Sequence, residues 1–264
     1  MAKIEITMTA DYVQDWGMWE GIREILQNAR DGELEENAPM SVRLSGNKLL
    51  VENEGVTLSR DSLLIGFTTK RQSTKSLGQF GEGMKLGTLA LCRLGYPVTI
   101  HNGDEIWTAK IEQSEKFGRE VLTFHIKKSR SANPKRKLTV AVAGITSELW
   151  EECRDRFLFL QEPRDVITVP SGKLILDEEY QGKVFVKGIF VADEAVRYGY
   201  DLPQVEIDRD RRMIRGFDLQ WEAGRIWAEA MTQEIARREE LANKAFQLLE
   251  KDYQEVRNIK FHVY

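Results

Sequence analysis

The chain has 264 residues, of which 42% are apolar, 30% charged and 9% aromatic, and its net charge is −4. This composition excludes a disordered or collagen-like chain, and the slight excess of acidic residues argues against a generally basic nucleic-acid-binding protein. A chain of this length is expected to form about one or two domains with a substantial core.

The two cysteines, Cys92 and Cys153, are too few for a disulfide framework or for a zinc site with four thiolate ligands. They are interpreted as buried thiols in a reducing compartment. No apolar stretch approaches the roughly 20 residues that cross a bilayer, and the N-terminal residues lack the apolar core of a signal peptide. We therefore expect a cytoplasmic protein with no membrane contact.

In the first half of the chain, the spacing of apolar residues predicts helices and strands around a polar, glycine-rich stretch at 66–83. The expected elements are, in order, a strand at 4–9, a helix at 16–33, a strand at 44–52 that contains a turn at 45–47, a helix at 84–94, and strands at 96–101, 105–112, 120–127 and 137–143. Gly95 is expected to cap the helix at 84–94.

The second half is expected to contain a long helix at 150–160, strands at 166–169, 173–176 and 183–191, and a helical tail at 218–256. Pro163 and Pro170 bracket a domain boundary, which we place between residues 165 and 166. The predicted fold class is α+β. It is a two-layer α/β sandwich, with helices on one face of a mixed, mostly antiparallel sheet, followed by a smaller α+β segment with long C-terminal helices.

The early helix carries Glu24, Asn28 and Asp31, which are four and three residues apart and so share one face. The opposite face is apolar, with Trp19, Ile22, Ile25, Leu26 and Ala29. A carboxylate, a carboxamide and a second carboxylate in one line can hold magnesium and orient a water molecule. The same pattern is also typical of the solvated face of an amphipathic helix.

Three glycines, Gly78, Gly81 and Gly83, directly precede the second helix. Glycine lets backbone amides approach a ligand closely, and the helix N-terminus behind them offers free N–H groups, so the segment could cradle an anion. It is not a Rossmann fingerprint, because no long strand leads into the first glycine, and not a Walker loop, because no Gly-Lys-Ser/Thr follows. A mobile loop is the alternative interpretation.

Taken together, the motifs form a series over residues 16–100: Glu24-x-x-x-Asn28-x-x-Asp31, then Val51-Glu52-Asn53-Glu54-Gly55-Val56-Thr57-Leu58, then Thr68-Thr69-Lys70, then Gly78-x-x-Gly81-x-Gly83. This series resembles the GHKL ATPase superfamily, which includes gyrase, the large heat-shock chaperone, histidine kinases and the MutL mismatch-repair protein. The segment 77–83 is especially similar to the chaperone's glycine-rich lid, and 68–70 to an element of MutL. The chain resembles a compact, free-standing member, of the kind found in tailed-phage genomes.

The resemblance implies a Bergerat ATP-binding fold in residues 1–165, a transducer-like segment in residues 166–264, and ATP and Mg²⁺ as ligands. By the same resemblance, Glu24 would be the general base, Asn28 would coordinate magnesium, Asp31 would support that face of the helix, and the glycines would close over the phosphates as a lid. The nucleotide-binding residues that it implies are Asn28, Asp31, Asn53, Gly55, Thr69, Lys70, Gly78, Phe80, Gly81, Glu82, Gly83 and Met84.

One position departs from the family pattern. Where the family has an Asp that accepts a hydrogen bond from the adenine amino group, this chain has Asn53, and Thr57 replaces a second glycine. An Asn carbonyl can accept that hydrogen bond, but the amide can equally donate one, so the base preference stays open. Glu52 or Glu54 could supply the carboxylate if the register differs.

The segment 184–191, followed by 207–210, loosely resembles the region after the chaperone's ATPase domain, where an Arg reaches the γ-phosphate. Arg209 is the matching catalytic candidate, and Lys187 is a second one. An arginine fork suits this role because it pairs with phosphate oxygens. The alternative for Arg209 is a surface run of ion pairs at 208–212.

A basic run between Lys127 and Lys137 could touch nucleic-acid phosphates, although such runs are more often solvated loops. The first hypothesis for function is a magnesium-dependent ATPase of slow turnover, in which lid closure alters a homodimer or a partner surface. One alternative is a nucleotide-sensing module without hydrolysis that recruits a protein or nucleic acid. A second alternative is a protein kinase of the same superfamily.

Overall fold

The computed structural model describes residues 2–63, 82–129, 137–205 and 216–262. The chain divides into two compact units, unit 1 (Met1–Cys153) and unit 2 (Arg154–Tyr264). Their assignment as nucleotide-binding and transducer-like domains, with a boundary between residues 165 and 166, stays a prediction.

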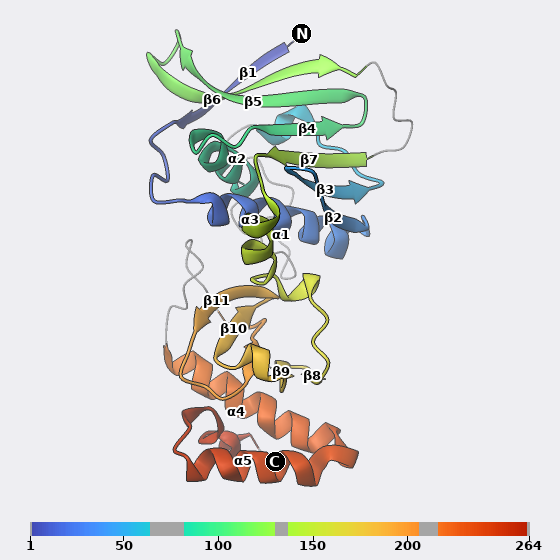
Figure 1. The fold of residues 1–264 in the computed structure, drawn as a ribbon, viewed down its shortest axis with the longest axis vertical. Coiled ribbons are helices and arrows are strands. Elements are labelled where there is room, and N and C mark those ends of the chain that lie inside the picture. The colour runs from blue at the N-terminus through green and yellow to red at the C-terminus, as the bar shows by residue number, and fades with distance from the viewer. Residues whose placement is uncertain (1, 64–81, 130–136, 206–215, 263–264) are drawn as a thin grey trace. The chain divides into compact units, whose positions relative to one another are not determined.

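Unit 1 is built on a seven-stranded sheet with the strand order β1-β6-β5-β4-β7-β3-β2 (Figure 1). Every described pair of neighbouring strands in this sheet is antiparallel. The strands are β1 (Ala2–Thr9), β2 (Met40–Ser45), β3 (Lys48–Glu54), β4 (Val98–Asn102), β5 (Glu105–Ser114), β6 (Arg119–Lys128) and β7 (Lys137–Ala143).

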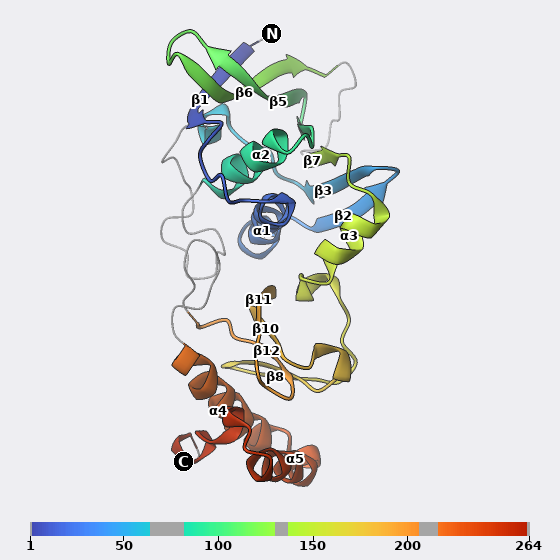
Figure 2. The same cartoon turned by 60° about the vertical axis from the view of Figure 1, so that its left-hand side comes forward.

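Helices α1 (Met18–Glu36) and α2 (Gly83–Arg93) lie together on one face of this sheet (Figure 2). The short helices η1 (Arg60–Leu63) and α3 (Ser147–Arg154) complete the unit. Because strand residues alternate between faces, each strand sends one row of apolar side chains toward the helices. The predicted α+β fold, with a two-layer sandwich, is confirmed.

The two helices of unit 1 approach each other closely. A Cβ on Gly87 of α2 would lie 2.8 Å from the carbonyl oxygen of Gly21 and 3.1 Å from Cβ of Glu24, both on α1. Only glycine fits such a contact without moving a helix. The close approach brings the middle of α1 beside the start of α2.

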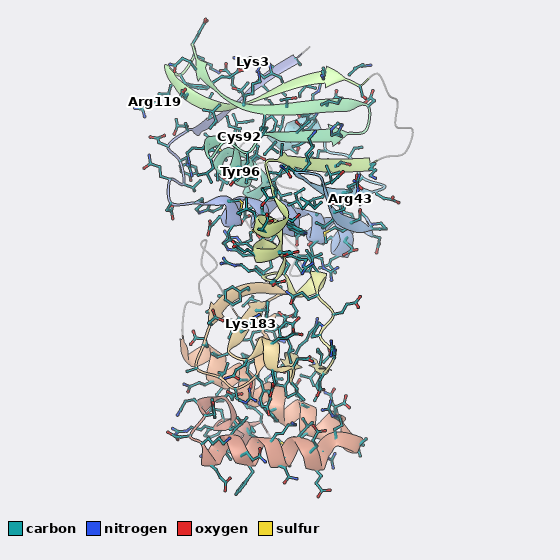
Figure 3. The ribbon with its side chains drawn as sticks, in the orientation of Figure 1. Lys3, Arg43, Cys92, Tyr96, Arg119 and Lys183 are labelled. Atoms are coloured by element: carbon teal, nitrogen blue, oxygen red, sulfur yellow. The ribbon has the colours of Figure 1, made fainter. Side chains whose placement is uncertain are left out.

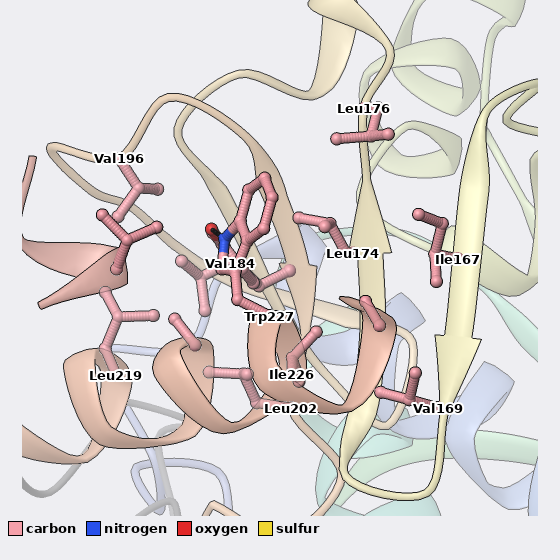
Figure 4. Close-up of a cluster of buried hydrophobic side chains, with 14 of the residues drawn as sticks. Ile167, Val169, Leu174, Leu176, Val184, Val196, Leu202, Leu219, Ile226 and Trp227 are labelled. Carbon is pink, nitrogen blue, oxygen red and sulfur yellow. Dashed lines mark hydrogen bonds between the residues drawn. The ribbon is translucent and has the colours of Figure 1, made fainter. Parts of the chain in front are cut away.

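Unit 2 contains a five-stranded sheet with the order β11-β10-β12-β9-β8 and two helices, α4 (Gly216–Gln233) and α5 (Arg238–Glu250). Its strands are β8 (Val166–Val169), β9 (Gly172–Ile175), β10 (Lys183–Val186), β11 (Ile189–Asp193) and β12 (Gly199–Asp201). The remaining elements are the 3₁₀ turns η2 (Leu158–Leu160), η3 (Glu178–Tyr180), η4 (Ile235–Arg237), η5 (Gln254–Val256) and η6 (Ile259–Phe261). Side chains of the sheet meet α4 around the fully buried Trp227 (Figure 4).

Four predicted elements differ from the structure, one of them the helical tail at 218–256, which is interrupted after Gln233 and in which α5 ends at Glu250. The strand at 44–52 is a hairpin of β2 and β3, and the strand at 183–191 is a hairpin of β10 and β11. In the second hairpin, Lys187 and Gly188 form the turn with φ of +51° and +79°, so Gly188 was a turn signal inside an apolar run. The prediction of a long helix at 150–160 is wrong. Helix α3 ends at Arg154, because Phe157 pairs with Ile189 and is buried in the core.

Both cysteines are free thiols, as the sequence indicated, but only Cys153 is fully buried, whereas Cys92 is half-buried. Cys92 lies on α2 (Figure 3), and burial raises the pKa of its thiol to about 11, which makes it a poor nucleophile at neutral pH. No helix in the described ranges has the length and apolar character needed to cross a membrane.

Candidate functional site

A cavity of about 340 Å³ lies in unit 1, between the helices and one end of the sheet. This volume falls in the range of small-molecule sites. The elements that line it are α1, β3, the segment 56–59, η1, α2 and β7. The lining residues are Ile25, Asn28, Ala29, Gly32, Glu36, Val51, Asn53, Val56, Thr57, Leu58, Ser59, Ser62, Met84, Lys85, Leu138 and Val140.

The walls contributed by the sheet are apolar. Val51 of β3 and Val140 of β7 are paired across the sheet and point into the cavity, and Leu138 lies two residues along β7 on the same face. Ile25 and Ala29 of α1 also line the cavity. An apolar slot of this kind suits a flat ring system.

Asn53 is the polar side chain on this apolar wall, and it is only 4% exposed. Its Nδ2 donates to the carbonyl oxygens of Ala29, at 2.8 Å, and Ala38, at 3.0 Å. Both amide hydrogens are therefore committed, and the reversed amide would set an oxygen against two carbonyl oxygens. What Asn53 can offer a ligand in the cavity is its Oδ1, a hydrogen-bond acceptor.

The two glutamates beside Asn53 do not line the cavity. Glu52 faces the other side of the sheet, where Lys137 lies 3.1 Å away and Thr139 donates to its Oε1. Burial alone would raise the pKa of Glu52, but Lys137, Thr139 and Arg43 together outweigh it and lower that pKa. Glu54 is exposed at the end of β3. The register thus excludes the alternative in which Glu52 supplies the carboxylate of the cavity.

Glu24 lies where α1 meets the start of α2, and its burial excludes a solvated helix face. It is 5% exposed, and its Oε1 accepts from Nε and Nη2 of Arg23, at 3.2 Å and 3.1 Å. Arg23 in turn covers the ring of Trp16. A Cβ on Gly83 would collide with Oε2 of Glu24, so the glycine lets this carboxylate reach the first turn of α2.

Asn28 lines the cavity one turn after Glu24. Its Nδ2 donates one hydrogen to the carbonyl oxygen of Glu24 at 2.7 Å, and its Oδ1 is the atom that can meet a cation. A Cβ on Gly83 would lie 3.5 Å from the Asn28 Nδ2. The structure therefore brings Glu24, Asn28 and Gly83 together. Asp31, on the same helix, is fully buried and is not among the residues that line the cavity.

Lys85, which was not among the residues predicted from the sequence, lies in the first turn of α2 and lines the cavity. It is 1% exposed, and its Nζ donates to the carbonyl oxygen of Ser62 at 3.0 Å. Burial lowers the pKa of this ammonium, and the charge of Glu82 acts in the opposite direction. The sequence did carry a signal of this burial: apolar residues occupy nearly every face of α2, which is typical of a buried helix.

Asn102, at the end of β4, was also missed. Its Oδ1 accepts from the backbone N–H of Leu58 at 2.8 Å, and its Nδ2 donates to the carbonyl oxygen of Leu58 at 2.9 Å. This pair of bonds fixes the segment 56–59 against the sheet and so shapes one wall of the cavity. No local pattern reveals it, because the partners are 44 residues apart.

The other predicted residues are placed as follows. Gly55 turns the chain after β3 with a φ of +80°, and Glu82 precedes α2 at its N-cap. Met84 lines the cavity. Lys187 lies in unit 2, on the turn between β10 and β11. Thr69, Lys70, Gly78, Phe80, Gly81 and Arg209 lie outside the described residues, as does the centre of the basic run.

Comparison with protein-family profiles and with curated protein sequences finds no match. Among solved structures, the chain is similar to the ATPase and transducer domains of DNA topoisomerase II from Balamuthia mandrillaris, with a TM-score of 0.41 and 12% identity. The alignment covers 66% of this chain and 60% of that one, so this chain spans less than two thirds of that structure. A similarity of this size identifies neither a family nor a function for this chain.

Proposed function

We propose that the cavity of unit 1 binds ATP with magnesium and that the protein hydrolyses it slowly. The observation that carries this proposal is the orientation of Asn53, whose Oδ1 is the acceptor left for a ligand at an apolar wall. An adenine ring offers a donor at its amino group, whereas guanine has a carbonyl oxygen at the corresponding position. The geometry therefore favours adenine.

The residues that line the cavity at the start of α2, away from Asn53, suit phosphates and magnesium. Lys85 and the first turn of α2 supply positive charge and N–H groups, which favour an anion. Asn28 Oδ1 is a hard oxygen donor, of the type that Mg²⁺ prefers. Within the described ranges, no group of three or more His, Cys, Asp or Glu side chains could hold a metal. Asn28 would therefore share the ion with phosphate oxygens.

Magnesium, when bound, would neutralise charge on the phosphate oxygens. The role proposed for Glu24 is to orient and deprotonate the attacking water. We assign the base to Oε2, the carboxylate oxygen that lies beside Gly83 at the start of α2. The Arg23 guanidinium would hold the carboxylate in one orientation throughout. Lid closure over the phosphates, the contributions of Arg209 and Lys187, and nucleotide-linked dimerisation rest on the sequence alone.

The test combines calorimetric binding of ATP and GTP with magnesium-dependent phosphate release. Wild type should bind ATP more tightly than GTP and release phosphate. Glu24→Gln should retain ATP binding and lose at least about 99% of turnover, as expected for loss of a general base. Glu52→Gln is the matched control, since its carboxylate faces the opposite side of the sheet, and it should hydrolyse ATP like wild type.

Asn53→Ala tests the base contact in the same assays. Removing one buried acceptor should weaken ATP binding by roughly tenfold and reduce the difference in affinity between ATP and GTP. Wild-type protein that binds no nucleotide would refute the proposal. Equal phosphate release by wild type and Glu24→Gln would refute the assignment of the base.

The pairing of Glu24 with Arg23 also favours the second candidate, a nucleotide-sensing module without hydrolysis. A carboxylate whose Oε1 already accepts two hydrogen bonds from a buried guanidinium has fewer lone pairs left to position a water molecule. In that case wild type would bind ATP and release no phosphate. Transfer of label from ATP to protein, rather than its release, would instead indicate a kinase.

A further inference from the structure

Helix α5, which packs against α4 and η5 (Figure 1), carries two apolar stripes. The buried stripe belongs to the core of unit 2 and consists of Leu241, Ala245 and Leu248. A second stripe follows one residue later at each position and consists of Ala242, Phe246 and Leu249. A helix at the surface of a protein needs only one apolar stripe, and the rest of its circumference is normally polar. The fold of unit 2 therefore does not explain the second stripe, which we call the outer stripe.

The outer stripe is exposed along its length. Phe246 is 61% exposed, Leu249 is 49% exposed, and Ala242 is exposed as well. Residues three and four apart are neighbours on a helix surface, so these side chains form one continuous row. Ile235, in η4 directly before α5, is 74% exposed. Single apolar residues on a surface are ordinary, but a continuous row of them marks a surface that binds a partner.

One flank of the outer stripe is acidic. At about 100° per residue, Glu239 and Glu250 lie on the same side of Phe246, one near each end of α5. Neither glutamate forms an ion pair with any residue in the described ranges, whereas Glu240 pairs with Arg237. Because both carboxylates are exposed, they are available to the cations of a partner.

The opposite flank carries Arg238, and this arginine is engaged within unit 2. Its Nε donates to the carbonyl oxygen of Met231 at 2.8 Å, and its Nη2 donates to the carbonyl oxygen of Thr232 at 3.2 Å. The guanidinium therefore stabilises the C-terminal end of α4, where a positive charge is favourable. The charge that the outer stripe presents to a partner is negative.

We propose that the outer stripe of α5 is the docking site for an amphipathic helix of a partner protein. The apolar face of that helix covers Phe246 and Leu249, and lysine or arginine side chains on its flank face Glu239 and Glu250. This site is separate from the cavity of unit 1 and does not depend on nucleotide binding.

The acidic flank distinguishes between the possible occupants. A second copy of α5, packed antiparallel across a two-fold axis, would set the acidic flank of one helix against that of the other. A bilayer surface with anionic lipids would repel the same glutamates. A helix with a basic flank is attracted instead. Since α5 has 13 residues and is about 20 Å long, the interface is small and of the class found in weak or transient complexes.

The probe is a synthetic peptide of about 18 residues, composed of Leu, Lys and Ala, in which the leucines form one helical stripe and the lysines flank it. A second peptide has Glu in place of every Lys. Calorimetry at low ionic strength measures the binding of each peptide to the full chain. Wild type should bind the basic peptide and not the acidic one, and the affinity should fall as salt is raised.

Two double variants separate the apolar contacts from the charges. Phe246→Gln/Leu249→Gln should weaken binding of the basic peptide by at least about tenfold. Its matched control, Leu34→Gln/Leu94→Gln, removes two exposed apolar side chains of unit 1 and should bind like wild type.

Glu239→Gln/Glu250→Gln should weaken binding by about threefold to tenfold at low ionic strength and have little effect at high salt. Glu115→Gln/Glu120→Gln, which removes two exposed carboxylates of unit 1, controls for net charge and should bind like wild type.

Equal binding of both peptides, no binding of either, or equal losses in the variants and their controls would overturn the proposal. A wild-type dimer in sedimentation that Phe246→Gln/Leu249→Gln converts to a monomer would show that a second copy covers the stripe. Cosedimentation of wild type, but not of that variant, with vesicles of phosphatidylcholine and phosphatidylserine would assign the stripe to a lipid surface. Either of these results would overturn the proposal as well.

Discussion

Asn53 in unit 1 and Glu255 in unit 2 are both buried polar side chains, but they are satisfied in different ways. Glu255 is fully buried, and its Oε1 accepts from Tyr200 Oη at 2.6 Å while its Oε2 accepts from the backbone N–H of Arg197 at 2.7 Å. Trp227 Nε1 completes this network by donating to Tyr200 Oη. Asn53 has partners only for its nitrogen, among the described residues, and its oxygen belongs to a cavity wall.

The contrast separates a structural group from a binding group. A buried polar atom that already has its partners holds the fold together, whereas one that faces a cavity is available to a ligand. Glu255 is therefore assigned to the stability of unit 2, and Asn53 to recognition. Four predictions test this distinction between structural and binding groups and the packing around them, beginning with the largest expected effect.

Glu255→Ala should destabilise unit 2 by about 3 kcal/mol, because it strands the Tyr200 hydroxyl and the Arg197 N–H inside the core. Urea unfolding followed by near-ultraviolet circular dichroism of the buried Trp227 measures this. ATP binding by unit 1 should not change. Glu250→Ala, on the exposed side of α5, is the control and should be nearly neutral. A neutral Glu255→Ala would show that the network contributes little.

Asn53→Asp should destabilise unit 1 by about 1–3 kcal/mol at neutral pH, because a carboxylate oxygen would face the carbonyl oxygens of Ala29 and Ala38. Protonation would restore one donor, so the folded pKa of the new Asp lies above its unfolded value. Stability should therefore be recovered below about pH 4 and lost as pH rises. Asn47→Asp, in the exposed turn before β3, is the matched control. Equal stability of both variants at neutral pH would contradict the assigned orientation of Asn53.

Gly87→Ala should destabilise unit 1 by about 1–2 kcal/mol and lower turnover, because the added methyl group pushes α2 away from Gly21 and Glu24. The gain in helix propensity offsets part of the cost. Gly32→Ala adds the same methyl group on α1, where the nearest atom would be Asn53 Nδ2 at 3.5 Å, and should not lower stability. Thermal unfolding of the two variants side by side gives the comparison, and a stable Gly87→Ala would show that the helices can separate at little cost.

The smallest expected effect is a pH dependence in unit 2. Burial raises the pKa of Glu255, against the hydrogen bonds from Tyr200 and the backbone. A raised folded pKa means that its contribution is fully present below the ordinary value of 4.5 and is lost as pH rises through the folded value. Relative to Glu255→Gln, which cannot titrate, wild type should lose stability as pH rises through that window. Parallel curves for the two proteins, from urea unfolding at each pH, would exclude titration of Glu255.

The sequence was sufficient where the pattern is local. The helix predicted at 84–94 is α2, and the strands at 137–143 and 166–169 have the predicted bounds, because apolar spacing and flanking polar residues define them. The spacing of Glu24 and Asn28 also placed both residues on one face of a helix.

Tertiary contacts decided what the sequence left open. Whether the Glu24 face is solvated depends on how closely α2 approaches, which Gly87 and Gly83 determine. Whether Asn53 donates or accepts depends on Ala29 and Ala38, which lie at a distance in sequence. The roles of Lys85 and Asn102 require the folded cavity, since their partners come from other elements.

The order of strands in unit 1 also has a consequence for biosynthesis. In the sheet wall of the cavity, β3 is paired with β7, and β1 is paired with β6 elsewhere in the same sheet. Long stretches of sequence separate the two members of each pair. At the usual rates of translation, on the order of ten seconds pass between the synthesis of β3 and that of β7. During that interval Ile25, Ala29 and Val51 lack the part of the cavity wall that Leu138 and Val140 of β7 supply. The nascent chain therefore leaves this apolar surface incomplete until β7 is made, and surface exposed in that way favours aggregation.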